Sequence, residues 1–157
     1  MKAIPREDVV KIVVFWVSQS WPLDLEKAEE MALGLGWERI EEGLLRMPYP
    51  LTNATATLTD MGKQESVAVI SFRVTDVVLE QSLERDAFMN DVFVGAVAGL
   101  QREWQKPKMR KSKEEYKAQW HLSNGCEVYL SNRWRVVSFV IFSPEYAEVE
   151  RYLRGRR

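Results

Sequence analysis

The sequence predicts an α+β protein in which helices pack on an antiparallel sheet of about six strands. One observation behind this class is the stretch 116–142, where apolar and polar residues alternate on both sides of an Asn124-Gly125 pair, as in a β-hairpin. The other is the presence of helix-period apolar patterns before, between and after the strand-like segments. The expected order is α-α-βββ-α-βββ-α, which is typical of an antiparallel sheet with helices on one face.

The hairpin loop is predicted to have three residues, Ser123-Asn124-Gly125, with Gly125 in the left-handed conformation. A two-residue loop would mix apolar and polar side chains on both faces, whereas a three-residue loop makes one face wholly apolar. The cross-strand pairs are then Leu122 with Cys126, Trp120 with Val128, and Ala118 with Leu130. The opposite face carries Gln119, His121, Glu127 and Tyr129.

Three further segments have strand-like patterns. Trp134 to Phe142 is apolar at both odd and even positions, which favours an interior strand covered on both sides. Trp37 to Met47 is predicted to form one strand with a bulge at Gly43. Residues 54–59 and 65–74 are predicted to pair as a second hairpin around the turn Asp60-Met61-Gly62.

Four helices are expected, over 7–19, 24–35, 83–105 and from Ser143-Pro144 to the end. Ser82 is the predicted N-cap of the third, and Lys106 to Lys113 is a basic connector after it. Close approach of another element is expected at Gly95 and Gly99. In the last helix, the side chains expected to face the core are Val149, Tyr152 and Leu153.

The chain has 157 residues, which predicts a single domain over 1–157. Its composition, 46% hydrophobic and 29% charged, is typical of a globular protein and not of a disordered one. Residues 1–80 hold 8 Lys and Arg against 13 Asp and Glu, whereas residues 81–157 hold 14 against 10. The overall charge of −1 therefore hides an acidic first half and a basic second half, a distribution suited to a charged partner.

The single cysteine, Cys126, excludes an intramolecular disulfide and favours a reducing compartment. Ile12 to Val17 is strongly apolar, but Glu7 and Asp8 stand where a signal peptide carries positive charge. No apolar run approaches the ~18 residues that a membrane-spanning helix needs. We therefore expect a cytoplasmic protein without a membrane segment.

No residue pattern predicts catalysis, a cofactor or a metal site. His121 is the only histidine, and it faces Glu127 across the predicted hairpin, so a base built on this pair is one hypothesis and an exposed strand histidine without a role is the other. Cys126 falls on the apolar face without a neighbouring cation that would activate it. Gly34-Leu35-Gly36 ends a helix and is not followed by the Lys-Ser/Thr of a phosphate loop. We therefore predict that the protein is not an enzyme.

The six tryptophans and the doubly apolar strand 134–142 predict a binding surface for another protein, or self-association as a homodimer. The long helix is expected to take part together with the sheet. The residues predicted to contact the partner are His121, Glu127, Tyr129, Arg135 and Phe139. The alternative is a nucleic-acid-binding protein that uses the basic segment within 104–120, through Lys106, Lys108, Arg110, Lys111 and Lys113.

Several segments carry a resemblance to a known fold: the 24–36 helix ending in Leu35-Gly36-Trp37, the 54–74 hairpin, the 83–105 helix and the Ser143-Pro144 helix start. Their order resembles the secretion-chaperone-like fold of type III secretion chaperones and YbjN-like proteins. The Leu-Gly-Trp segment and a late Trp-x-Leu strand are similar to small actinobacterial domains of unknown function, some thought to be immunity proteins for secreted toxins. This resemblance implies a bacterial, non-enzymatic protein that is chaperone-like or toxin-immunity-like.

Overall fold

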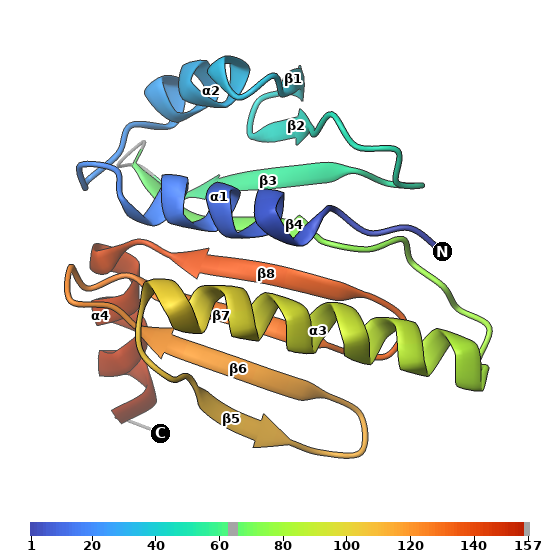
Figure 1. Ribbon diagram of the computed structural model, residues 1–157. Helices are drawn as coiled ribbons and strands as arrows, with labels where there is room; N and C mark the ends of the chain where they lie inside the picture. Colours follow the sequence, from blue (N-terminus) through green and yellow to red (C-terminus); the bar gives the residue numbers. More distant parts are fainter. Residues whose placement is uncertain (63–65, 156–157) are drawn as a thin grey trace.

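The computed structural model describes residues 1–62 and 66–155. Within them the chain forms four helices and eight strands, and all the strands belong to one antiparallel sheet (Figure 1). The helices are α1 (Arg6–Val17), α2 (Leu25–Gly34), α3 (Leu83–Glu103) and α4 (Pro144–Gly155). The strands are β1 (Glu38–Glu41), β2 (Leu44–Arg46), β3 (Thr55–Asp60), β4 (Val67–Arg73), β5 (Lys108–Lys111), β6 (Tyr116–His121), β7 (Glu127–Asn132) and β8 (Val137–Phe142). No helix of this described part is long and apolar enough to cross a membrane.

The sheet consists of two four-stranded meanders that lie side by side, in the order β1-β2-β3-β4-β8-β7-β6-β5. They join where β4 pairs with β8, with Phe72 opposite Phe139. The α+β class and the single antiparallel sheet are thus confirmed. The expected count of six strands is wrong because each meander contains one strand that the sequence pattern did not reveal.

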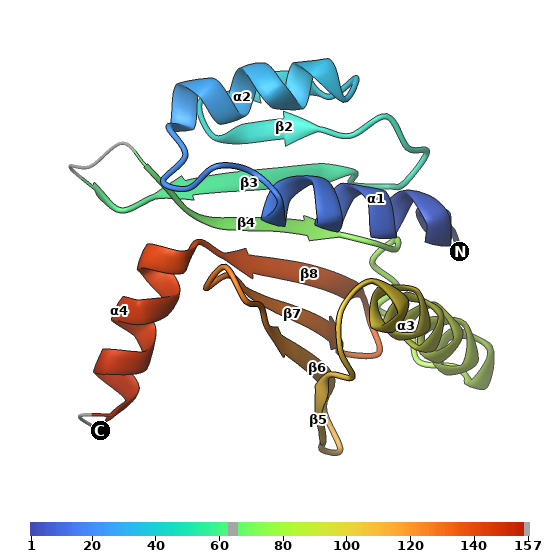
Figure 2. The ribbon, with the colours of Figure 1, turned by 60° about the vertical axis from the view of Figure 1, so that its left-hand side comes forward.

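Helices α1 and α3 pack against each other, and α3 packs on β7 and β8. A Cβ added to Gly99 would lie only 2.7 Å from Cγ2 of Val10, which confirms the close approach of α1 expected there, whereas at Gly95 the nearest atom, Cδ of Arg6, would be at an ordinary 3.7 Å. Helix α4 lies on the opposite side of strands β6 to β8 from α3 (Figure 2). The expectation that all helices share one face is therefore wrong for α4.

The segment from Trp37 to Met47 forms two strands, not one. Gly43 lies in the turn between β1 and β2 with φ +75°, and a Cβ added to it would be 2.6 Å from the carbonyl oxygen of Leu58. The bulge that was expected at Gly43 lies instead within β1, between Arg39 and Glu41. Every side chain of β1 is exposed, so the strand lacks the alternation that would have marked it as separate.

The expected basic connector Lys106 to Lys113 contains the edge strand β5, which pairs with β6 and sets Met109 opposite Ala118. All four residues of β5 are exposed. Three of them are Lys or Arg, a composition common on sheet edges but weak as a strand signal. Exposure on both faces thus explains why pattern analysis missed this strand.

The central hairpin is confirmed in loop length and register. Gly125 has φ +98°, and the backbone N–H of Leu122 donates to the carbonyl of Cys126 at 2.9 Å. Trp120 pairs with Val128 and is fully buried. The amide of Asn124 donates to the carbonyl of Val17 at 2.8 Å, which ties the loop to the end of α1.

The hairpin of β3 and β4 is also confirmed. Part of the connection between these strands lies outside the described residues, and so does residue 65, where the second strand was expected to start.

The last strand and the last helix depart from expectation in burial. Val137, Phe139 and Ile141 of β8 are fully buried, but Val140 and Phe142 are half-buried on the other face, so the strand is covered fully on one side only. Trp134 lies in the preceding turn with φ +69°.

In α4 the buried residue is Ala147. The three side chains predicted to face the core are 40%, 62% and 43% exposed, in the order Val149, Tyr152 and Leu153.

Replacement of Gly125 by alanine should destabilise the protein. Alanine disfavours a φ of +98°, and its Cβ would lie 3.0 Å from Cβ of Pro144. We expect the free energy of unfolding, measured by urea denaturation, to fall by about 1–3 kcal/mol.

Gly34→Ala is the matched control, because a Cβ at this exposed helical residue meets nothing within 4 Å. It should be neutral or stabilise the protein by up to about 1 kcal/mol. Equal losses in the two variants would show that the loop does not require a glycine.

Candidate functional site

A groove of about 550 Å³ lies on the face of β6, β7 and β8 that α1 and α3 leave uncovered. Alternation along the strands produces this face: Ala118 and Trp120 point into the core, so Lys117 and Gln119 point away from it. The groove is lined mainly by side chains of these strands, the edge strand β5 and helix α4. They are Arg110, Glu115, Lys117, Gln119, Tyr129, Ser131, Arg133, Val136, Ser138, Val140, Phe142, Glu150 and Arg154.

Helix α4 borders the groove because the chain turns directly out of β8 into the helix. The hydroxyl oxygen of Ser143 accepts a hydrogen bond from the backbone N–H of Tyr146 at 3.1 Å, and Pro144 occupies the first helical position. The ring of Tyr146 packs edge-on against Phe142, with 4.9 Å between ring centroids. The cap and this aromatic contact fix where the helix begins on the sheet.

Glu127 anchors the rest of α4. Its side chain is only 3% exposed, and it accepts a hydrogen bond of 2.7 Å from the hydroxyl of Tyr129. Two cations from α4 reach the same carboxylate, Nη2 of Arg154 at 3.5 Å and Nε of Arg151 at 3.8 Å. Nδ1 of His121 lies 3.5 Å away on the neighbouring strand. A buried charge needs such partners, so the polar side of α4 faces the sheet and its apolar side faces solvent.

The floor of the groove has an apolar part beside the polar side chains of Gln119, Ser131 and Ser138, and its rim is mainly cationic. Val140 and Phe142 lie on the floor beside the ring of Tyr129, whose centroid is 4.9 Å from Nζ of Lys117. Burial, with the hydrogen bond and charge of Glu127, raises the pKa of Tyr129 to about 12. The phenol is therefore neutral at physiological pH and keeps its proton while donating a hydrogen bond to Glu127. On the rim, Arg133 lies 3.8 Å from Glu115.

Three of the five residues predicted to contact a partner lie together: His121, Glu127 and Tyr129. The other two lie elsewhere. Arg135 is exposed in the turn between β7 and β8, and its carbonyl accepts a hydrogen bond from Val78. Phe139 is fully buried on the core face and stacks on Phe72, so it is not available to a partner.

Of the three predicted residues that lie together, Tyr129 lines the groove, whereas the Glu127 side chain is 3% exposed and is paired within the protein. The groove also contains residues that are not among the five predicted to contact a partner. They include Val140 and Phe142, from the strand expected to be covered on both sides, and Arg154 of α4. The spacing of Arg151 and Arg154 in the sequence predicts that both lie on one side of α4. Their pairing with Glu127 is not predictable in this way, because Glu127 is distant from them in the sequence. Of the predicted nucleic-acid-binding cations, Arg110 lines the groove.

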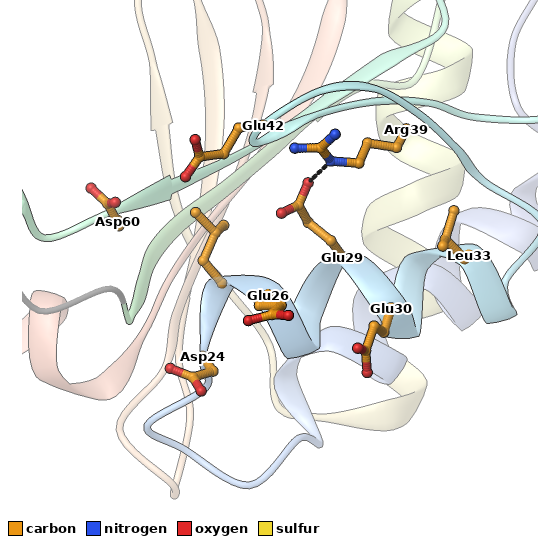
Figure 3. A pocket seen from close by; sticks show the side chains of 9 residues that line it. Asp24, Glu26, Glu29, Glu30, Leu33, Arg39, Glu42 and Asp60 are labelled. Atoms are coloured by element: carbon orange, nitrogen blue, oxygen red, sulfur yellow. Dashed lines mark hydrogen bonds and ion pairs between the residues drawn. The ribbon is translucent and has the colours of Figure 1, made fainter.

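A second concavity, of about 510 Å³, lies between α2 and the end of β1 (Figure 3). Carboxylates predominate in it, and Arg39 is its one cation, bound to Glu29 at 2.7 Å. Its acidic residues are Asp24, Glu26, Glu29, Glu30, Glu42 and Asp60. Over residues 1–62 and 66–155, no three His, Cys, Asp or Glu side chains are grouped so that they could hold a metal ion.

Cys126 is fully buried, as predicted from its place on the apolar face. Burial raises the pKa of its thiol to about 12; contact with the Asn124 side chain opposes this rise and the charge of Glu145 adds to it. The thiol is therefore protonated at physiological pH and poorly nucleophilic.

These features define a class of α+β protein with one antiparallel sheet, one face under helices and the other face carrying a charged groove. The chain belongs to the DUF6301 family, a family of unknown function, whose model matches residues 7–143. Helix α4 follows this matched segment. Neither the curated proteins nor the solved structures gave a match. The resemblance to secretion chaperones and immunity-like domains gains no support from these comparisons and stays a prediction.

Removal of the Glu127 carboxylate should loosen α4. In Glu127→Ala the two arginines lose their buried partner, and we expect a loss of about 1–3 kcal/mol in the free energy of unfolding. Hydrogen exchange should become faster in peptides from α4 than in peptides from β3 and β4. Glu148→Ala, at an exposed position of the same helix, is the control and should leave both measurements unchanged. Slow exchange in α4 of the Glu127 variant would show that the helix is held by other contacts.

Burial of the Cys126 thiol should make stability depend on alkaline pH. Its pKa is raised from 9.0 to about 12 on folding, so its stabilising effect is complete below pH 9 and is lost as pH rises towards 12. The free energy of unfolding should therefore fall above pH 9, and the fall should be smaller in Cys126→Ala. Cys126→Ala retains Tyr129, so a difference in slope between the two proteins comes from the thiol and not from this phenol. Identical slopes in the two proteins would rule out a thiol contribution.

Proposed function

We propose that this protein is a non-enzymatic binding protein whose groove receives an extended, acidic segment of a partner protein. The observation that carries the proposal is the combination of partly exposed apolar side chains, Val140 and Phe142, with a cationic rim on one face of the sheet. Sites that bind a ligand usually combine apolar walls with a few well-placed polar groups. The chaperone-like and immunity-like roles suggested by the resemblance both belong to this class of function.

The charge around the groove supports an acidic ligand. Four cations line it, Arg110, Lys117, Arg133 and Arg154, against two carboxylates. Both carboxylates already have partners within the protein: Glu115 accepts a hydrogen bond from Ser131 and lies near Arg133, and Glu150 accepts one of 2.8 Å from Tyr146. The surplus of positive charge would attract carboxylates of a partner and keep basic segments away.

The floor supports a peptide with apolar side chains between its acidic ones. In an extended chain alternate side chains point to opposite sides, so apolar residues can contact Val140 and Phe142 while carboxylates reach the rim. The long helix α3, expected to grip the partner as well, lies on the other face of the sheet (Figure 2). We therefore limit the proposal to the groove, and place the protein in the cytoplasm on the basis of its single buried cysteine.

Nucleic acid is the second candidate, favoured by one observation. Lys106, Lys108, Arg110, Lys111 and Lys113 are all exposed. Arg110 pairs with Lys117 across β5 and β6, and Nζ of Lys117 lies 4.9 Å from the centroid of the Tyr129 ring, an arrangement that could hold a phosphate beside a stacked base. The two proposed functions use some of the same cations, but one predicts tighter binding of an acidic peptide and the other tighter binding of nucleic acid.

The test is fluorescence anisotropy with a labelled peptide of alternating glutamate and leucine, at low and at high salt. We expect binding that weakens with salt and that the double variant K117E/R133E weakens by about tenfold or more. The matched control is K11E/K27E, which changes the same charge at exposed residues of α1 and α2. Circular dichroism establishes that both variants are folded.

An unlabelled oligothymidylate serves as the competitor. If it displaces the peptide at a lower concentration than unlabelled peptide does, nucleic acid becomes the better candidate. No binding of the peptide by the unmodified protein, or equal weakening by both double variants, would overturn the proposal.

A further inference from the structure

The two edge strands of the sheet carry opposite charge. β1 ends one side of the sheet and β5 ends the other (Figure 1). β1 contributes Glu38 and Glu41 beside the acidic concavity of α2, and its one cation, Arg39, is bound to Glu29. β5 contributes Lys108, Arg110 and Lys111. All residues of both strands are exposed. The acidic half of the sequence thus supplies an acidic edge of the sheet, and the basic half supplies a basic edge.

Exposed edge strands pair readily with other strands unless charge or shape prevents it. Here charge prevents only the pairing of like edges, because two β1 strands would bring glutamates together and two β5 strands would bring lysines together. A β1 strand beside a β5 strand brings glutamates and cations together. Each edge therefore repels the same edge of a second copy and attracts the opposite edge.

The direction of the strands permits such pairing without turning the molecule over. Every pair of neighbouring strands in the eight-stranded sheet is antiparallel, so β1 and β5 run in opposite directions. A second copy in the same orientation can then place its β1 antiparallel to β5 of the first. Its helical face and its groove face would continue those of the first copy.

Continuation of the register within the sheet gives one set of residues that would meet. Directly opposed residues form unbroken rows from one edge to the other. On the groove face one row runs through Glu41, Leu44, Thr57, Ser71, Val140, Tyr129, Gln119 and Lys108. On the core face another runs through Arg39, Leu45, Ala56, Phe72, Phe139, Leu130, Ala118 and Met109.

Continuation of these rows into a second copy pairs Lys108 with Glu41 and Met109 with Arg39. The bulge in β1 skips Ile40, so Arg110 then falls opposite Glu38. Both pairs on the groove face join a cation to a carboxylate. The exposed side chain of Met109 would be covered next to Ile40, which is itself 41% exposed.

We propose that copies of this chain associate head to tail, with β1 of one copy added to β5 of the next, to form one continuous antiparallel sheet. Such a contact is heterologous, so each added copy presents a new β1 or β5 edge and the assembly grows instead of closing as a dimer. The twist of the sheet makes the assembly helical. The proposal concerns the edges and does not depend on what the groove binds.

The first measurement is the mass of the purified full chain by sedimentation velocity and light scattering, over a range of concentration and salt. The expected result is a mass that rises beyond a dimer with concentration at low salt and falls as salt screens the edge charges. A monomer at every concentration in low salt would overturn the proposal, and so would a dimer whose mass does not change with salt.

Charge reversal provides the decisive comparison. K108E/R110E makes both edges acidic and E38K/E41K makes both basic, so each variant alone should be monomeric. An equimolar mixture should associate, because every edge of one variant then complements an edge of the other. K106E/K113E, whose changes lie outside β5, carries the same charge change as the first variant and should still associate.

A mixture that stays monomeric, while both variants give the circular dichroism of the unmodified protein, would contradict edge pairing. Edge pairing would also be contradicted if K108E/R110E alone, or E38K/E41K alone, associated as strongly as the unmodified chain. The groove variant K117E/R133E leaves both edges intact, so a failure of peptide binding and a failure of assembly can be told apart.

Discussion

The pairing of β4 with β8 is the interaction on which the rest of the sheet depends. Among the described residues it is the one ladder that joins a strand of the first half of the chain to a strand of the second. It stacks Phe72 on Phe139 in the middle of the core, at 5.5 Å between ring centroids. The packing of α1 against α3 crosses the same boundary and adds to the attachment of the two halves.

The two faces of the sheet are stabilised by different physical means. The core face is apolar and is covered by helices whose small residues allow close packing, as at Gly99. The groove face holds one helix, and it does so through a buried carboxylate that attracts two arginines. The helices on the core face are thus held by close apolar packing, whereas α4 is held by contacts between particular charged atoms.

The sequence was most informative where burial and backbone conformation restrict the same residues. The hairpin around Gly125 was predictable because a left-handed glycine and an apolar face permit one register, and the opposition of His121 and Glu127 followed from it. The start of α3 was predictable because Ser82 caps it, accepting from the N–H of Arg85. Strands β1 and β5 were not, since exposed edges need no apolar alternation. The groove and the inward-facing side of α4 depend on Glu127, which is distant in sequence from the arginines that bind it.

The cap of α4 has a practical consequence for expression of this protein. The match to the family ends at Ser143, the residue whose hydroxyl begins the helix. A truncation at that boundary would retain every strand of the sheet. It would also remove the arginines that pair with Glu127 and the Tyr146 ring that packs on Phe142, so that more apolar surface of the sheet would meet solvent. Domain limits taken from sequence similarity alone would thus yield a fragment prone to aggregation, and the C-terminal limit of a recombinant fragment belongs after Gly155.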